Sequence, residues 1–112
     1  MKQNKLKDMK CSACSGNTPK LTNEEIAIRL SQLIKWQVND EGNMIFKKFK
    51  FSNFRKSLKF LNLVGDIAEN ESHHPDSSIG WGYCLIMLHT HSIKGLSLND
   101  FIVASKIDLI SI

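Results

Sequence analysis

The sequence has no hydrophobic run long enough to cross a membrane and no apolar segment near its start. A membrane-spanning helix needs about 20 consecutive apolar residues, and a signal peptide needs an apolar h-region. The sequence of 112 residues contains neither kind of segment. The hydrophobic content of 42% and the charged content of 23% argue against an intrinsically disordered chain. We therefore expect a cytoplasmic protein without membrane association that folds around one core.

Cysteine is too scarce for a disulfide framework, because three cysteines cannot all pair. Cys11 and Cys14 form a CxxC, but a zinc ribbon needs a second such pair. Cys84 stands alone in an apolar stretch, so four-thiolate zinc is excluded. A redox CxxC lies at the start of a helix that follows a strand, whereas this one lies in a polar segment. We interpret the pair as incidental.

The charge is mildly basic, with 15 Lys and Arg against 11 Asp and Glu and a net charge of +4. Four of the lysines lie in the first ten residues, which predicts a solvated tail over residues 1–20 and a single domain over residues 21–112. The chain has neither RNP-like aromatic residues nor a basic recognition helix, so we expect no direct binding of nucleic acid. No internal repeat or linker is visible.

Three helices are predicted from polar caps followed by apolar residues every three or four positions. Thr22 and Glu25 have the spacing of a capping box, and the apolar pattern after them predicts a helix to about Lys35. Residues 52 and 53 cap an amphipathic helix of about seventeen residues. Ser97 and Asp100 begin a third helix that continues to near the C-terminus.

Four strands are predicted between these helices. Residues 36–38 and 44–51 flank a cluster of turn formers and predict a hairpin. Residues 81–90 alternate as a strand, and residues 76–82 predict a short strand before it. The order α-β-β-α-β-β-α lacks the regular alternation of a parallel sheet. It predicts an α+β domain, with the three helices packed on one face of a four-stranded antiparallel sheet.

All four histidines fall within residues 73–91, close to several carboxylates. The unperturbed pKa of histidine, about 6.5, suits general acid/base catalysis near neutral pH. A zinc site is a second possibility, in which His89 and His91 bind the metal with a third ligand from His73 or His74. Structural roles are a third, at the end of a helix or the margin of the sheet. Spacing alone leaves the three interpretations open.

The same segment resembles the signature of the pterin-4a-carbinolamine dehydratases. That signature is an acidic residue, three spacers, His-His-Pro, an aromatic residue, a histidine and an aspartate. Seven residues match it over 32 positions: Glu69, His73, His74, Pro75, Trp81, His91 and Asp100. Residues 91–101 also resemble the bacterial members, as do the CxxC and Trp36. The resemblance covers about a hundred residues.

The resemblance implies a 4a-hydroxytetrahydrobiopterin dehydratase, a hydro-lyase. Such an enzyme converts 4a-hydroxytetrahydropterin to quinonoid dihydropterin and water, in the recycling of tetrahydrobiopterin for aromatic amino acid hydroxylation. The pterin is the substrate, and the reaction needs neither metal nor redox cofactor. The resemblance also implies a functional link to a phenylalanine hydroxylase and a homodimer or homotetramer. Animal relatives act as dimerisation cofactors of a homeodomain transcription factor, so a non-enzymatic binding module is the alternative.

The resemblance assigns roles to individual residues as well. His73, His74 and His91 are the expected catalytic residues: His73 and His91 would exchange protons, and His74 would mainly hold the substrate. The expected substrate-binding or orienting residues are Glu69, Trp81 and Asp100, with Asp100 closing a helix beside His91. His89 matches no family histidine.

Overall fold

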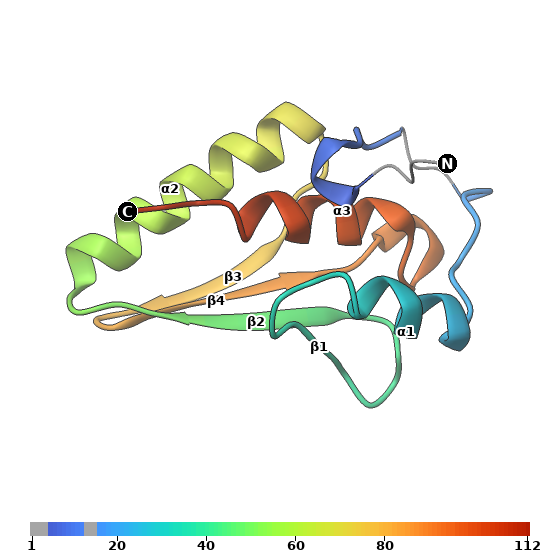
Figure 1. The fold of residues 1–112 in the computed structure, drawn as a ribbon, viewed down its shortest axis with the longest axis horizontal. Coiled ribbons are helices and arrows are strands. Elements are labelled where there is room, and N and C mark those ends of the chain that lie inside the picture. The colour runs from blue at the N-terminus through green and yellow to red at the C-terminus, as the bar shows by residue number, and fades with distance from the viewer. Residues whose placement is uncertain (1–4, 13–15) are drawn as a thin grey trace.

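One antiparallel sheet organises the protein (Figure 1), and its last strand in sequence leads directly into residues 89–91, which include two of the four histidines. The structure is a computed structural model that describes residues 5–12 and 16–112. Its strands lie in the order β1-β2-β4-β3, and their bounds are Gln37–Val38 (β1), Ile45–Lys50 (β2), Asp76–Gly80 (β3) and Tyr83–Leu88 (β4). β4 pairs with β2 on one side and with β3 on the other. The predicted four-stranded antiparallel sheet is confirmed.

The three predicted helices are also confirmed within the described residues, in the predicted order. They are α1 (Asn23–Leu30), α2 (Phe54–Glu71) and α3 (Leu98–Ile107), and two short 3₁₀ turns accompany them, η1 (Leu6–Asp8) and η2 (His91–Ile93). α2 and α3 cover one face of the sheet (Figure 1), and α1 contributes Ile26 to the same core. Of the described helices, none has both the length and the apolar character that a membrane span requires.

Alternation along β4 separates the core from the outer face of the sheet. Cys84, Ile86 and Leu88 are fully buried, whereas the residues between them are only partly buried. The buried residues pack in the same core as Phe101 and Val64 from the covering helices. Burying one such aliphatic side chain contributes about 1.5–3 kcal/mol, so β4 is anchored firmly just before the chain reaches its histidines.

The first helix ends earlier than predicted, at Leu30 instead of about Lys35. Residues 31–35 form turns instead, and Lys35 adopts a left-handed conformation with φ of 59°. The Asp108 carboxylate accepts hydrogen bonds from the Ile34 backbone N–H at 3.3 Å and from the Trp36 indole at 3.0 Å. These contacts hold the chain away from the helix axis. Leu33 still packs against the core, so the apolar periodicity of the sequence continues beyond the last residue of the helix.

Residues 5–12 pack on the domain, although the sequence analysis expected a solvated tail there. Leu6 is 5% exposed and belongs to the core, and η1 lies against α3. The Cys11 backbone N–H donates to the Glu71 carboxylate at 2.8 Å. A single leucine among lysines carries no periodicity, so the pattern gave no sign of this packing. Cys14, the second cysteine of the CxxC, lies outside the described residues.

Candidate active site

The first two histidines follow a sharp change of chain direction at the end of α2. Ser72 ends the helix in the left-handed region, with φ of 53° and ψ of 37°. The His73 backbone N–H donates to the Ala68 carbonyl at 3.2 Å, which satisfies one of the free carbonyls at the helix end. Pro75 follows, and β3 begins at Asp76. His73 and His74 therefore lie at the junction between α2 and the sheet.

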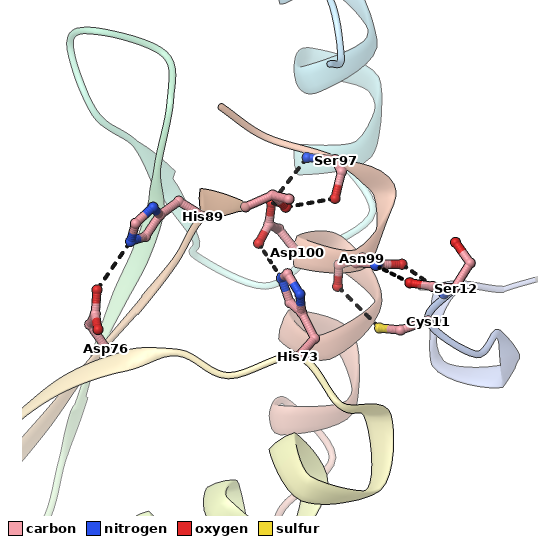
Figure 2. A network of polar contacts seen from close by, with 9 residues as sticks. Cys11, Ser12, His73, Asp76, His89, Ser97, Asn99 and Asp100 are labelled. Atoms are coloured by element: carbon pink, nitrogen blue, oxygen red, sulfur yellow. Dashed lines mark hydrogen bonds and ion pairs between the residues drawn. The ribbon is translucent and has the colours of Figure 1, made fainter. Parts of the chain in front are cut away.

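His73 is held by a buried carboxylate at the start of α3. Its Nε2 lies 2.7 Å from Asp100 Oδ1, and Asp100 is fully buried (Figure 2). The other oxygen, Oδ2, accepts hydrogen bonds from the Ser97 backbone N–H at 3.0 Å and from the Thr90 hydroxyl at 2.8 Å. Asp100 thus closes the predicted capping box and orients a histidine, but that histidine is His73 and not the expected His91.

The other two histidines project from the end of β4 and from η2. The rings of His89 and His91 lie with their centroids 4.0 Å apart and tilted by 58°. His89 Nε2 lies 3.1 Å from Asp76 Oδ2 on the neighbouring strand (Figure 2). The third partner proposed from sequence for a zinc site was His73 or His74, but the carboxylate of Asp76 stands beside His89 instead.

The remaining predicted residues lie at two different places. The exposed side chains of Glu69 and His74 form a hydrogen bond through Oε2 and Nε2. Trp81 lies between β3 and β4, at the end of the hairpin remote from Asp76, and is 70% exposed. The structure of this single chain does not bring Trp81 to the histidines.

A pocket of about 330 Å³ brings the four histidines together. It is lined by residues 72–76 and 89–92. The volume lies in the range of small-molecule sites, about 300–1,000 Å³. The sequence analysis gave no role in the site to Thr90 or Asp76. Two signals were available in the sequence. Thr90 continues the alternation that buries every second residue of β4, and Asp76 directly follows His-His-Pro.

The loop after His91 returns the chain to the start of α3 through a left-handed residue. That residue is Lys94, with φ of 51°. The Thr90 backbone N–H donates to the Gly95 carbonyl at 2.8 Å. A side chain at Gly95 would meet the stem of Lys20 at 2.9 Å, so this glycine permits a close approach of two chain segments.

An ion pair ties the end of α2, directly before the pocket-lining residues 72–76, to α3. Lys106 Nζ lies 2.6 Å from Glu71 Oε2. Burial acts to raise the pKa of Glu71, but the hydrogen bonds from Lys106 and from the Cys11 backbone outweigh it, and the pKa lies below its usual value. The carboxylate is thus held charged in a partly buried position.

Comparisons with known proteins identify the family of this chain. The family model described as pterin 4 alpha carbinolamine dehydratase matches residues 19–110. The chain belongs to the pterin-4a-carbinolamine dehydratase family. A relative from Rickettsia bellii that carries this family name is 45% identical over 106 residues, which cover 94% of this chain and 93% of the relative.

Two solved structures share the fold of this chain. A transcriptional coactivator/pterin dehydratase from Brucella melitensis superposes with a TM-score of 0.76 at 30% identity, covering 80% of this chain and 96% of that one. A pterin dehydratase-like protein, solved as a RuBisCO assembly factor of the alpha-carboxysome, has a TM-score of 0.57 at 22% identity. The match covers 67% of this chain and 87% of that chain, and it shows only that the two share a fold. Membership of the family assigns dehydratase activity, a hydro-lyase reaction on a pterin.

Proposed function

We propose that the histidine pocket converts 4a-hydroxytetrahydropterin to quinonoid dihydropterin and water by general acid/base catalysis without a metal or redox cofactor. The observation that carries the proposal is the shared pocket: His73, His74 and His91 line one space of about 330 Å³ although they come from different elements. In the cell the reaction would recycle tetrahydrobiopterin for aromatic amino acid hydroxylation, next to an enzyme such as phenylalanine hydroxylase.

The chemistry needs one acid and one base. The bond between C4a and its hydroxyl oxygen breaks, and an acid gives a proton to that oxygen, so that water leaves. A base takes the proton from N5, and a double bond forms between N5 and C4a. Imidazole serves in either role near neutral pH. His73 and His91 are the proposed proton-transfer groups.

The environments of these two histidines differ in a way that supports this assignment. The Nε2 atom of His73 faces the Asp100 carboxylate, which orients the ring and leaves Nδ1 to exchange a proton with the substrate. Asp100 is accordingly a positioning residue. His91 is exposed and lines the same pocket from a different element, η2. His74, paired with Glu69, would hold the substrate.

The excess rate of dehydration tests the proposal. A phenylalanine hydroxylase generates the 4a-hydroxypterin, and its decay is followed by ultraviolet absorbance with and without the purified protein. The intermediate also dehydrates unaided, so only the difference counts. We expect faster decay with the protein. Decay at the rate in buffer would reject the dehydratase and favour the alternative of a non-enzymatic dimerisation or binding module.

We also propose that the chain forms a homodimer or homotetramer. β3 is an edge strand of five residues, and among the described residues it pairs only with β4. An unpaired edge is a template for another strand. On α2, Phe54 is 45% exposed and Leu58 43% exposed, which adds apolar surface. Light scattering coupled to size exclusion measures the mass, and a monomer at micromolar concentration would contradict the proposal.

A further inference from the structure

Asp76, His89 and His91 form a cluster of potential metal ligands that the proposed dehydration does not require. Each offers one ligand atom, and the three atoms lie within 4.8 Å of one another. Two imidazoles and a carboxylate are the donor set of many zinc and non-haem iron sites. In the part of the chain that the structure describes, no other group of three such side chains converges in this way.

The backbone of the sheet arranges the three donors before any metal arrives. Asp76 stands opposite Met87 in the β3–β4 register, and His89 lies two residues beyond Met87. The two are therefore diagonal neighbours on the same face of the sheet, close enough for their side chains to meet. His91 lies two residues further on, and its ring already contacts that of His89.

The distances suit a small divalent ion after a minor adjustment. Zinc binds imidazole nitrogen and carboxylate oxygen at about 2.0–2.2 Å, which places neighbouring donors of a tetrahedron about 3.3 Å apart. The Nε2 of His89 and the Oδ2 of Asp76 are 3.1 Å apart, close to that value. Only the His91 ring has to approach, and its exposed side chain has room to rotate.

We infer that Asp76, His89 and His91 bind one divalent first-row transition metal ion, with an open coordination position toward the pocket. His73 and His74 do not take part, because their ring nitrogens lie outside the group of converging ligand atoms. The inference has one consequence that rests on the proposed function. A metal on His91 occupies a proposed proton-transfer group, so the bound ion inhibits dehydration.

Calorimetric titration with zinc chloride tests the binding directly and needs no activity. The parent protein carries Cys11→Ser and Cys14→Ser, so that thiolates do not contribute, and is freed of metal with a chelator. We expect one zinc per chain. His89→Ala and Asp76→Asn should each weaken binding at least about tenfold, and Asp76→Asn keeps the size of the side chain.

His74→Ala is the matched control, because His74 lines the same pocket but lies outside the donor set. Its zinc affinity should stay within about twofold of the parent. The inference fails if the parent binds no zinc, if His89→Ala or Asp76→Asn binds as tightly as the parent, or if His74→Ala weakens binding as much as they do. Histidine ¹⁵N spectra provide a second readout: zinc should shift the ring signals of His89 and His91 and leave those of His73 unchanged.

The dehydratase assay separates this inference from the proposed function. We expect stoichiometric zinc to slow the metal-free parent and a chelator to restore the rate. Zinc binding without inhibition would overturn the predicted consequence for His91 and leave the metal site in place. A metal-free protein that is inactive and gains activity with zinc would overturn the free-imidazole mechanism, and the same titration would still support the site.

Discussion

The Asp100 carboxylate is fully buried and is surrounded by donors from three parts of the chain. Ser97 and Thr90 bond to one oxygen, and His73 bonds to the other. Leaving a buried acceptor without a partner costs about 1–3 kcal/mol, and more if it is charged. His73 therefore contributes to the stability of the fold as well as to the pocket, whereas the exposed His91 contributes to the pocket alone.

His73→Ala and His91→Ala should each lower the turnover of the dehydratase. A positioned proton-transfer group contributes about 10²- to 10⁴-fold, and the facile uncatalysed reaction favours the low end. His73→Ala should also lower the free energy of unfolding by about 1–3 kcal/mol, while His91→Ala should change it little. Steady-state kinetics and chemical denaturation measure the two effects, and circular dichroism establishes that each variant is folded.

His89→Ala and His74→Ala are the comparisons for this pair. The loss of turnover in His89→Ala should be much smaller, since His89 is assigned no proton transfer. His74→Ala should mainly raise KM, because a group that binds substrate and transition state equally affects binding and not the bound step. If His89→Ala is as damaging as His91→Ala, or if His73→Ala leaves the rate unchanged, these residue assignments are wrong.

At the scale of the element, the end of α2 determines the positions of His73 and His74. Ser72 makes this turn in a left-handed conformation, although it is not a glycine. That conformation costs a residue with a side chain about 1–2 kcal/mol. The hydrogen bond from the His73 backbone to Ala68 and the burial of the His73 side chain offset this cost.

Ser72→Gly should therefore raise the free energy of unfolding, by up to about 1 kcal/mol after the greater flexibility of glycine in the unfolded chain is included. Thermal and urea denaturation measure the change. Ser105→Gly is the matched control, because Ser105 lies inside α3 in helical conformation. There the same substitution should lower the free energy of unfolding of the protein. Destabilisation by Ser72→Gly would show that the serine side chain outweighs the backbone strain.

The elements were predictable where their signals are local. The Thr22 and Ser97 capping boxes form as their three-residue spacing indicates, and β4 buries the residues that alternation selects. The end of α1 was not predictable, because it depends on Asp108, a residue more than seventy positions away. The pairing of His73 with Asp100 joins residues 27 positions apart. Sequence spacing places both in one signature but does not say which histidine the carboxylate faces.

At the scale of the whole molecule, Glu71 links three segments of the chain. Its carboxylate accepts hydrogen bonds from Lys106 on α3 and from the backbone of Cys11 in the N-terminal segment, while its own backbone ends α2. No periodicity in the sequence distinguishes Glu71 from the neighbouring acidic residues of the helix. Its role follows from the packing of η1 against α3, which the sequence analysis did not predict.

Glu71→Gln should destabilise the protein at neutral pH by about 1–3 kcal/mol, because it weakens two hydrogen bonds to a charged group. The hydrogen bonds from Lys106 and from the Cys11 backbone hold the pKa of Glu71 below its usual value of 4.5. Its contribution is therefore complete above about pH 4.5 and is lost as the pH falls through the folded pKa. Urea denaturation from pH 7 down to pH 3 should show that the two proteins converge at the acidic end. Glu69→Gln is the control, because Glu69 also lies near the end of α2 but its side chain is exposed. This substitution should lower the free energy of unfolding much less at pH 7. A constant difference between Glu71→Gln and the parent across this range would contradict the assigned role of the carboxylate charge.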